Sequence, residues 1–176
     1  CAQRLKQKDR ALELAARIPL AANAKALRLR FLSENGAWQD LVDAFRDEPI
    51  DRWPAPLQGD AYYARGQAFR MLKDGPRAEA DLARALATLL QARGQVLAAA
   101  LLADTRRTLL QDEAKALEAY RDAQRRALAF DRWGYTFFTV TATLAEMLAA
   151  QNRFDEALAV LDSGTGGRTS APDRGR

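Results

Sequence analysis

The sequence contains no histidine, and Cys1 is its only cysteine. Without an imidazole, no Ser/His or Cys/His nucleophile pair can form, and the zinc sites that need histidine are excluded as well. One cysteine cannot form an intramolecular disulfide, so the sequence does not indicate a redox compartment. These absences favour a protein that is not an enzyme and that uses no metal and no cofactor.

Long apolar runs are missing too. The best candidate, 96–103, falls well short of the roughly 18 residues that a membrane span needs, and Asp104 follows it. We therefore predict no membrane span. The first residues lack the apolar core and the cleavage site of a secretory signal, so export would need a signal upstream of Cys1, and a cytoplasmic location is favoured. A terminal cysteine could also be the acylated first residue of a bacterial lipoprotein.

The basic excess is confined to the two ends of the chain. Residues 1–30 hold eight Lys or Arg against two acids, and residues 163–176 hold three Arg against one acid, whereas the net charge of the whole chain is only +4. The body between them is therefore mildly acidic. A continuous basic stripe, which a nucleic-acid backbone would require, is missing, and we expect no nucleic-acid partner.

Apolar residues recur at helical spacing from 61 to 90, with one interruption at Lys-Asp-Gly-Pro, residues 73–76. This pattern predicts a helix, a tight turn and a second helix. The same plan recurs along the chain, and the predicted hairpins are about 23–46, 60–90, 95–129 and 135–162. Residues 1–19 hold only the second helix of a further hairpin, which favours a fragment of a longer protein over a lipoprotein terminus.

Two segments do not fit a hairpin. The prolines within 47–56 each remove a backbone donor and restrain the preceding residue, so this segment is expected to be a spacer. Residues 163–176 are rich in Gly, Ser, Thr and Arg without periodic apolar positions, which predicts a disordered tail. The predicted helical domain is therefore 1–162.

The hairpin at 60–90 resembles the tetratricopeptide repeat. Its first helix has the small and aromatic residues of that family at Gly66 and Phe69, and its second has the small, large, small series at Ala78, Leu82 and Ala85. The last hairpin matches with Ala145, Ala157 and Leu161, and the third with Ala116, Tyr120 and Ala123, although Asp104 takes a small-residue position. The resemblance implies an all-α fold, a right-handed α-solenoid of stacked helix-turn-helix hairpins.

The repeats are unequal in length. The markers of the second helices are Ala11, Leu41, Ala78, Ala116 and Ala157, and their spacings of 30, 37, 38 and 41 residues differ from the family's regular repeat of about 34. The first full hairpin, 23–46, also departs from the pattern, with Leu41 in place of alanine. The resemblance is therefore to a degenerate array.

Members of this family bind partners in a concave groove lined by the first helices. By the resemblance and helical register, the groove residues are predicted to be Tyr63, Gln67, Arg70, Met71, Leu101, Thr105, Thr108, Leu109, Thr139, Ala142, Glu146 and Ala150. Some members grip a terminal carboxylate with Lys and Asn, where this chain has Tyr63 and Gln67. We therefore expect a hydrophobic peptide or an adjacent domain as partner, and not an acidic tail.

Three other features admit two interpretations each. The acid pairs 112–113 and 155–156 could share acid and base chemistry, but they precede predicted second helices, where carboxylates stabilise the exposed amides. The aromatic set Tyr120, Trp133, Tyr135, Phe137 and Phe138 could stack on bases or sugars, or pack between hairpins. Trp53, flanked by prolines, could cover the core or offer a partner an exposed anchor.

Three functions fit the sequence. The first is a protein–protein interaction scaffold. The second is a structural or regulatory repeat segment of a larger multidomain bacterial protein, a source suggested by the preference for Arg over Lys. The third is an RNA-binding helical-repeat module, which only the pI near 9.5 favours. An uncapped end repeat could also mediate self-association.

Overall fold

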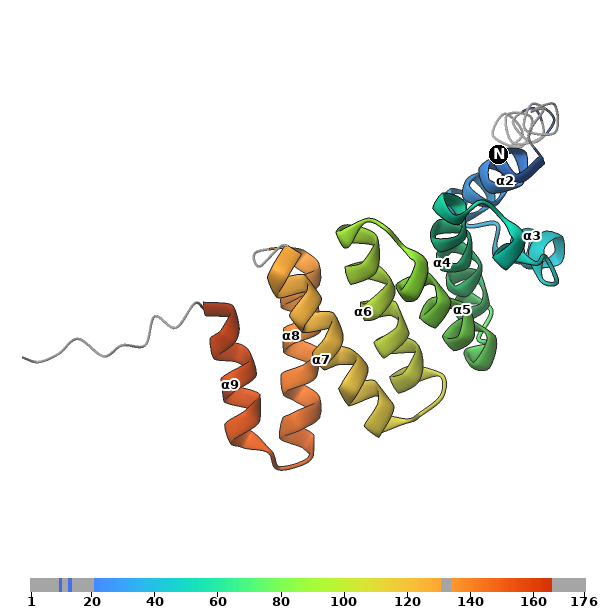
Figure 1. Cartoon of the computed structure of the whole chain (residues 1–176). Coiled ribbons are helices and arrows are strands. Elements are labelled where there is room, and N and C mark those ends of the chain that lie inside the picture. The colour runs from blue at the N-terminus through green and yellow to red at the C-terminus, as the bar shows by residue number, and fades with distance from the viewer. Residues whose placement is uncertain (1–9, 11–12, 14–20, 131–133, 166–176) are drawn as a thin grey trace, which may run out of the picture. The chain divides into compact units, whose positions relative to one another are not determined.

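The computed structural model describes residues 10, 13, 21–130 and 134–165. These residues form helices joined by turns, with no strand among them (Figure 1). The elements are α2 (Ala21–Glu34), α3 (Trp38–Phe45), the 3-10 helix η1 (Ile50–Arg52), α4 (Ala55–Met71), α5 (Gly75–Thr88), α6 (Ala92–Thr108), α7 (Glu113–Phe130), α8 (Tyr135–Ala150) and α9 (Phe154–Thr165). The predicted all-α class is confirmed. The partial hairpin predicted at 1–19 lies almost entirely outside the described residues.

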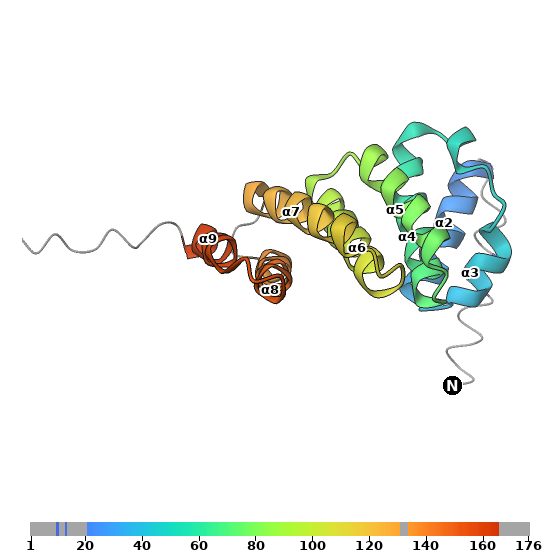
Figure 2. The ribbon, with the colours of Figure 1, turned by 90° about the horizontal axis from the view of Figure 1, so that it is seen from below.

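Two compact units make up the chain, residues 1–94 and residues 95–176. In the first unit, α4 is central, because α2, α3 and α5 all pack against it. In the second unit, α8 packs against both α7 and α9. Figure 2 shows α2 beside α4 and α8 beside α9 in a second view. Within each unit, helices that follow one another in the chain are therefore packing neighbours.

The turns inside the four helix pairs share one conformation. Each has a residue with positive φ two positions before the second helix begins, and these residues are Gly36, Lys73, Gln111 and Asn152. In three of the turns, the amide of the residue that follows the positive-φ residue donates to the carbonyl five residues earlier, at 2.9 Å. The bond from Asp74 to Phe69 is an example. This is the bond that ends a helix on a left-handed residue. The turn predicted at 73–76 lies at one of these places, and the other three fall inside predicted hairpins.

The markers of the second helices occupy equivalent positions in the structure. Leu41, Ala78, Ala116 and Ala157 are each the fourth residue of α3, α5, α7 and α9, and all four are buried. Each amide donates to the carbonyl of the residue four positions earlier, at 2.8–3.0 Å. The register predicted for these helices is therefore confirmed. Leu161 differs, because 45% of its surface is exposed on α9, the last described helix.

Two predicted boundaries are wrong. Helix α4 begins at Ala55, inside the predicted spacer, and residues 50–52 form η1. Pro56 is tolerated because it stands in the first turn of α4, where backbone amides have no partner within the helix. Helix α9 continues to Thr165, so residues 163–165 belong to a helix and not to the predicted tail. The rest of that tail lies outside the described residues.

A buried guanidinium connects three elements of the first unit. Arg65 on α4 donates to both carboxylate oxygens of Asp81 on α5, at 2.6 and 3.0 Å. Its Nη1 also donates to the carbonyls of Phe45 and Glu48, each at 2.9 Å, at the end of α3 and beyond it. Only 7% of Arg65 is exposed. These bonds fix α3 and α5 relative to α4.

Candidate functional site

An apolar groove of about 570 Å³ lies between α2 and α4. Its volume falls in the range of roughly 300–1,000 Å³ that is typical of binding pockets. Its lining residues are Asn23, Ala26, Leu27, Leu29, Arg30, Ser33, Glu34, Leu57, Asp60, Ala61, Tyr63 and Ala64. All of these described residues belong to the first unit.

Helical spacing explains which side chains line the groove. The residues from α2 recur at intervals of three and four, from Asn23 through Ala26 and Arg30 to Glu34, and therefore share one face. The other face of α2 contacts the rest of the unit. There Lys25 donates to Glu48 at 2.6 Å, and the Arg28 guanidinium lies 5.9 Å from the centre of the Phe45 ring.

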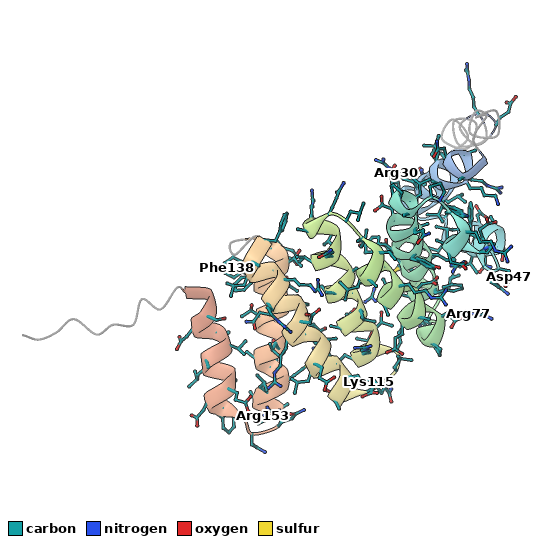
Figure 3. The ribbon with its side chains drawn as sticks, in the orientation of Figure 1. Arg30, Asp47, Arg77, Lys115, Phe138 and Arg153 are labelled. Carbon is teal, nitrogen blue, oxygen red and sulfur yellow. The ribbon has the colours of Figure 1, made fainter. Side chains whose placement is uncertain are left out.

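The charged residues of the lining are Arg30, Glu34 and Asp60. The Arg30 Nε donates to the Glu34 Oε1 at 2.7 Å, and both side chains are exposed, with Arg30 pointing to solvent in Figure 3. The pKa of Arg30 is raised by this hydrogen bond and by the charge of Glu34, with a smaller effect of Asp60. Asp60 is exposed and forms no ion pair or hydrogen bond among the described side chains.

Tyr63 is half-buried at the groove. Burial raises the pKa of its phenol, against a smaller opposing effect of the Arg70 charge. The phenol is therefore protonated at neutral pH and offers a hydrogen-bond donor beside the apolar side chains. A partner's backbone carbonyl would be a suitable acceptor.

Of the groove residues predicted on α4, Tyr63 lines the groove. Gln67 and Arg70 are half-buried and Met71 is exposed, but none of these three belongs to its lining. Sequence reasoning missed the contribution of α2, although the spacing from Asn23 to Glu34 is helical and α2 is a first helix in the predicted array. The groove is thus displaced toward the beginning of α4 and shared with α2.

The residues predicted on α6 differ in exposure. Leu101 and Leu109 are half-buried, and Thr108 is exposed with its hydroxyl donating to the Asp104 carbonyl at 2.7 Å. Thr105 is 0% exposed, and its hydroxyl donates to the Leu101 carbonyl at 2.8 Å. The side chain of Thr105 is therefore inaccessible to a partner, and its assignment to a binding surface is corrected.

The residues predicted on α8 are exposed. Thr139, Ala142, Glu146 and Ala150 recur at intervals of three and four, so they form one face of this helix. Its other side carries Val140, Leu144 and Leu148, which are buried.

The structure distinguishes the two interpretations of Trp53. Its ring is buried, packs edge to face on Phe45 with the ring centres 6.3 Å apart, and its Nε1 donates to Glu48 at 2.9 Å. Trp53 therefore belongs to the core of the first unit and is not an exposed anchor.

The aromatic region of the second unit divides between core and surface. Tyr120 and Phe137 are buried, whereas 86% of Tyr135 and half of Phe138 are exposed. The rings of Phe137 and Phe138 meet edge to face, with their centres 5.7 Å apart, and Trp133 lies outside the described residues. A continuous stacking platform does not form from the described members of this set.

The acid pairs lie where helix starts were predicted. Asp112 accepts from the Lys115 amide at 3.0 Å, and this bond, followed by the Lys115 ammonium, lowers the pKa of Asp112. Asp155 and Glu156 lie in the first turn of α9. Among the described residues there is no group of three or more His, Cys, Asp or Glu that could hold a metal ion, and no helix that could span a membrane.

Comparison of the chain with protein-family models and with curated proteins finds no match.

Proposed function

We propose that this chain is a tetratricopeptide-like scaffold without catalytic activity, and that it binds an apolar peptide segment of a partner protein in the groove between α2 and α4. The groove carries this proposal. Its lining is largely aliphatic, with a phenol and a few charged groups near it, which is the composition of sites that bury apolar side chains and orient them through a few polar contacts.

The equivalence of the four turns and of the buried markers supports the repeat-array interpretation. In such an array, the first helices of neighbouring hairpins lie side by side, as α2 and α4 do in the first unit. Preformed helical walls would bind a peptide at a low entropic cost, because little of the protein must be ordered on binding.

The test is selection from a random peptide-display library on the full chain, followed by fluorescence anisotropy with the selected peptides. Replacing Leu27, which is 47% exposed in the groove, by glutamine should weaken binding about fivefold or more, because roughly 1 kcal/mol of apolar burial is lost. Tyr63→Ala should have a similar effect.

Leu90→Gln is the matched control, because this leucine is 78% exposed and lies outside the groove. Circular dichroism verifies that all three variants stay helical. Peptides that bind the Leu27 variant as well as the parent chain would place the binding surface elsewhere and refute the proposal.

A structural segment of a larger protein is the second candidate. Helix α9 bears an exposed apolar stripe of Phe154, Leu158 and Leu161, at intervals of four and three. A stripe of this kind is usually covered by another element. The test is sedimentation of the full chain at rising concentration: if α9 mediates assembly, Leu158→Glu abolishes a concentration-dependent increase in mass.

The RNA-binding alternative lacks support in the described residues. Several basic side chains there are paired with carboxylates. Arg121 and Arg153 both form an ion pair with Glu156, and Lys115 forms one with Asp112. Such pairs reduce the net positive charge that a phosphate backbone would meet.

A further inference from the structure

The groove between α2 and α4 has an uneven charge. One cationic side chain, Arg30, stands in its lining against two carboxylates, Glu34 and Asp60. Glu34 forms an ion pair with Arg30, with 2.7 Å between the Glu34 Oε1 and the Arg30 Nε. Asp60 is exposed and forms no ion pair with any described residue. The carboxylate of Asp60 is therefore available to a ligand.

Three other cations of α2 and α4 are engaged away from the groove. Lys25 forms an ion pair with Glu48, and the Arg28 guanidinium lies over the Phe45 ring. Arg65 is buried in its network with Asp81. Among the described residues of the lining, Arg30 is the one cation near Asp60, and the influence between the two charges is weak.

We propose that the groove selects segments that carry a lysine or arginine next to bulky apolar side chains, and that Asp60 binds this cation. The inference rests on the proposed function, because it specifies the partner of the same groove. Asp60 follows Leu57 and precedes Tyr63 by three residues each on α4, so its carboxylate stands beside the apolar lining.

A long basic side chain suits this arrangement. Its methylene stem can lie on the aliphatic surface while the charged end reaches Asp60, and both contributions favour binding. An acidic side chain in the same place would face two carboxylates and be repelled. The geometry therefore discriminates by charge as well as by hydrophobicity.

The experiment uses the display library described above and the full chain. Peptides that depend on Leu27 should be enriched in Lys and Arg relative to the unselected library. Replacing the basic residue of a selected peptide by glutamine should weaken binding about two- to fivefold, the range of an exposed ion pair, and glutamate should weaken it further.

Asp60→Asn should reproduce that loss for the basic peptide and leave the glutamine peptide unaffected. Asp60→Lys should reverse the preference toward glutamate. Asp47→Asn is the matched control, because this substitution removes the same charge from an exposed residue that lies away from Arg30 (Figure 3). The preference should also decline between about 50 and 200 mM salt, because exposed pairs are screened.

The two proposals fail in different ways. If no selected peptide depends on Leu27, both the peptide-binding function and its charge preference are refuted. If Leu27-dependent peptides show no basic enrichment, or bind Asp60→Asn unchanged, the function stands and the role of Asp60 is refuted.

Discussion

The most specific stability prediction concerns the buried pair of Arg65 and Asp81. Both side chains are less than a tenth exposed, and Arg65 makes two bonds to Asp81 and two short bonds to backbone carbonyls. Removing one member of a buried pair leaves an uncompensated charge and typically costs about 3–5 kcal/mol. Arg65→Met should cost at least as much as Asp81→Asn, because it also deprives the carbonyls of Phe45 and Glu48 of their donor.

The double variant Arg65→Met, Asp81→Leu separates the contribution of the ion pair from that of the hydrogen bonds to the backbone carbonyls. For an isolated buried ion pair, an apolar replacement of both members is often neutral or stabilising. Here the carbonyls of Phe45 and Glu48 would still lose a donor, so the double variant should remain destabilised by about 1–3 kcal/mol.

Urea denaturation followed by tryptophan fluorescence provides the assay. Trp38 and Trp53 belong to the first unit and Trp133 to the second, so a Trp133→Phe background reports on the first unit alone. A loss below about 1 kcal/mol for Asp81→Asn would refute the reasoning, because the buried guanidinium would then tolerate the absence of its carboxylate.

Three further predictions concern the same unit. Gly59→Ala should destabilise it by about 1–3 kcal/mol in the same assay, although alanine favours helix, because the added Cβ would lie 2.8 Å from backbone atoms of Leu89. Gly36→Ala is expected to strain the backbone of the turn and not the packing, because Gly36 has a φ of +66° and an added Cβ would make only ordinary van der Waals contact with the Trp38 ring, at 3.8 Å. Burial raises the pKa of Glu48, but hydrogen bonds from Lys25 and Trp53 together lower it below its ordinary value. The contribution of Glu48 to the free energy of unfolding should therefore be present above the ordinary glutamate pKa and be lost as the pH falls through the lower pKa of the folded state. Glu48→Gln should accordingly reduce the fall of the unfolding free energy on the acid side, measured by urea denaturation at several pH values.

Local pattern identified the helices and their turns. The interruption at 73–76 marked a turn that the structure contains, because glycine and proline favour turn conformations over a continuous helix. The markers from Leu41 to Ala157 were recognised because one buried face of a helix recurs every three or four residues. The helix boundaries were predicted less accurately. Helix α4 begins at Ala55, before the apolar pattern that starts at residue 61, because prolines are as compatible with the first turn of a helix as with a spacer.

The candidate site depended on the packing of helices far apart in sequence. Register on α4 selected Tyr63 but could not show that α2 forms the opposite wall, because the relative rotation of two helices is set by contacts between them. The same limit applies to Arg65 and Asp81, sixteen residues apart, which a charge pattern would assign to a solvated face. The sequence by itself determined the helices, the turns and the buried faces, since these follow from local spacing. Only the tertiary structure decided which charges are buried together, that Trp53 is core, and where the groove lies, because each depends on distances between separate helices.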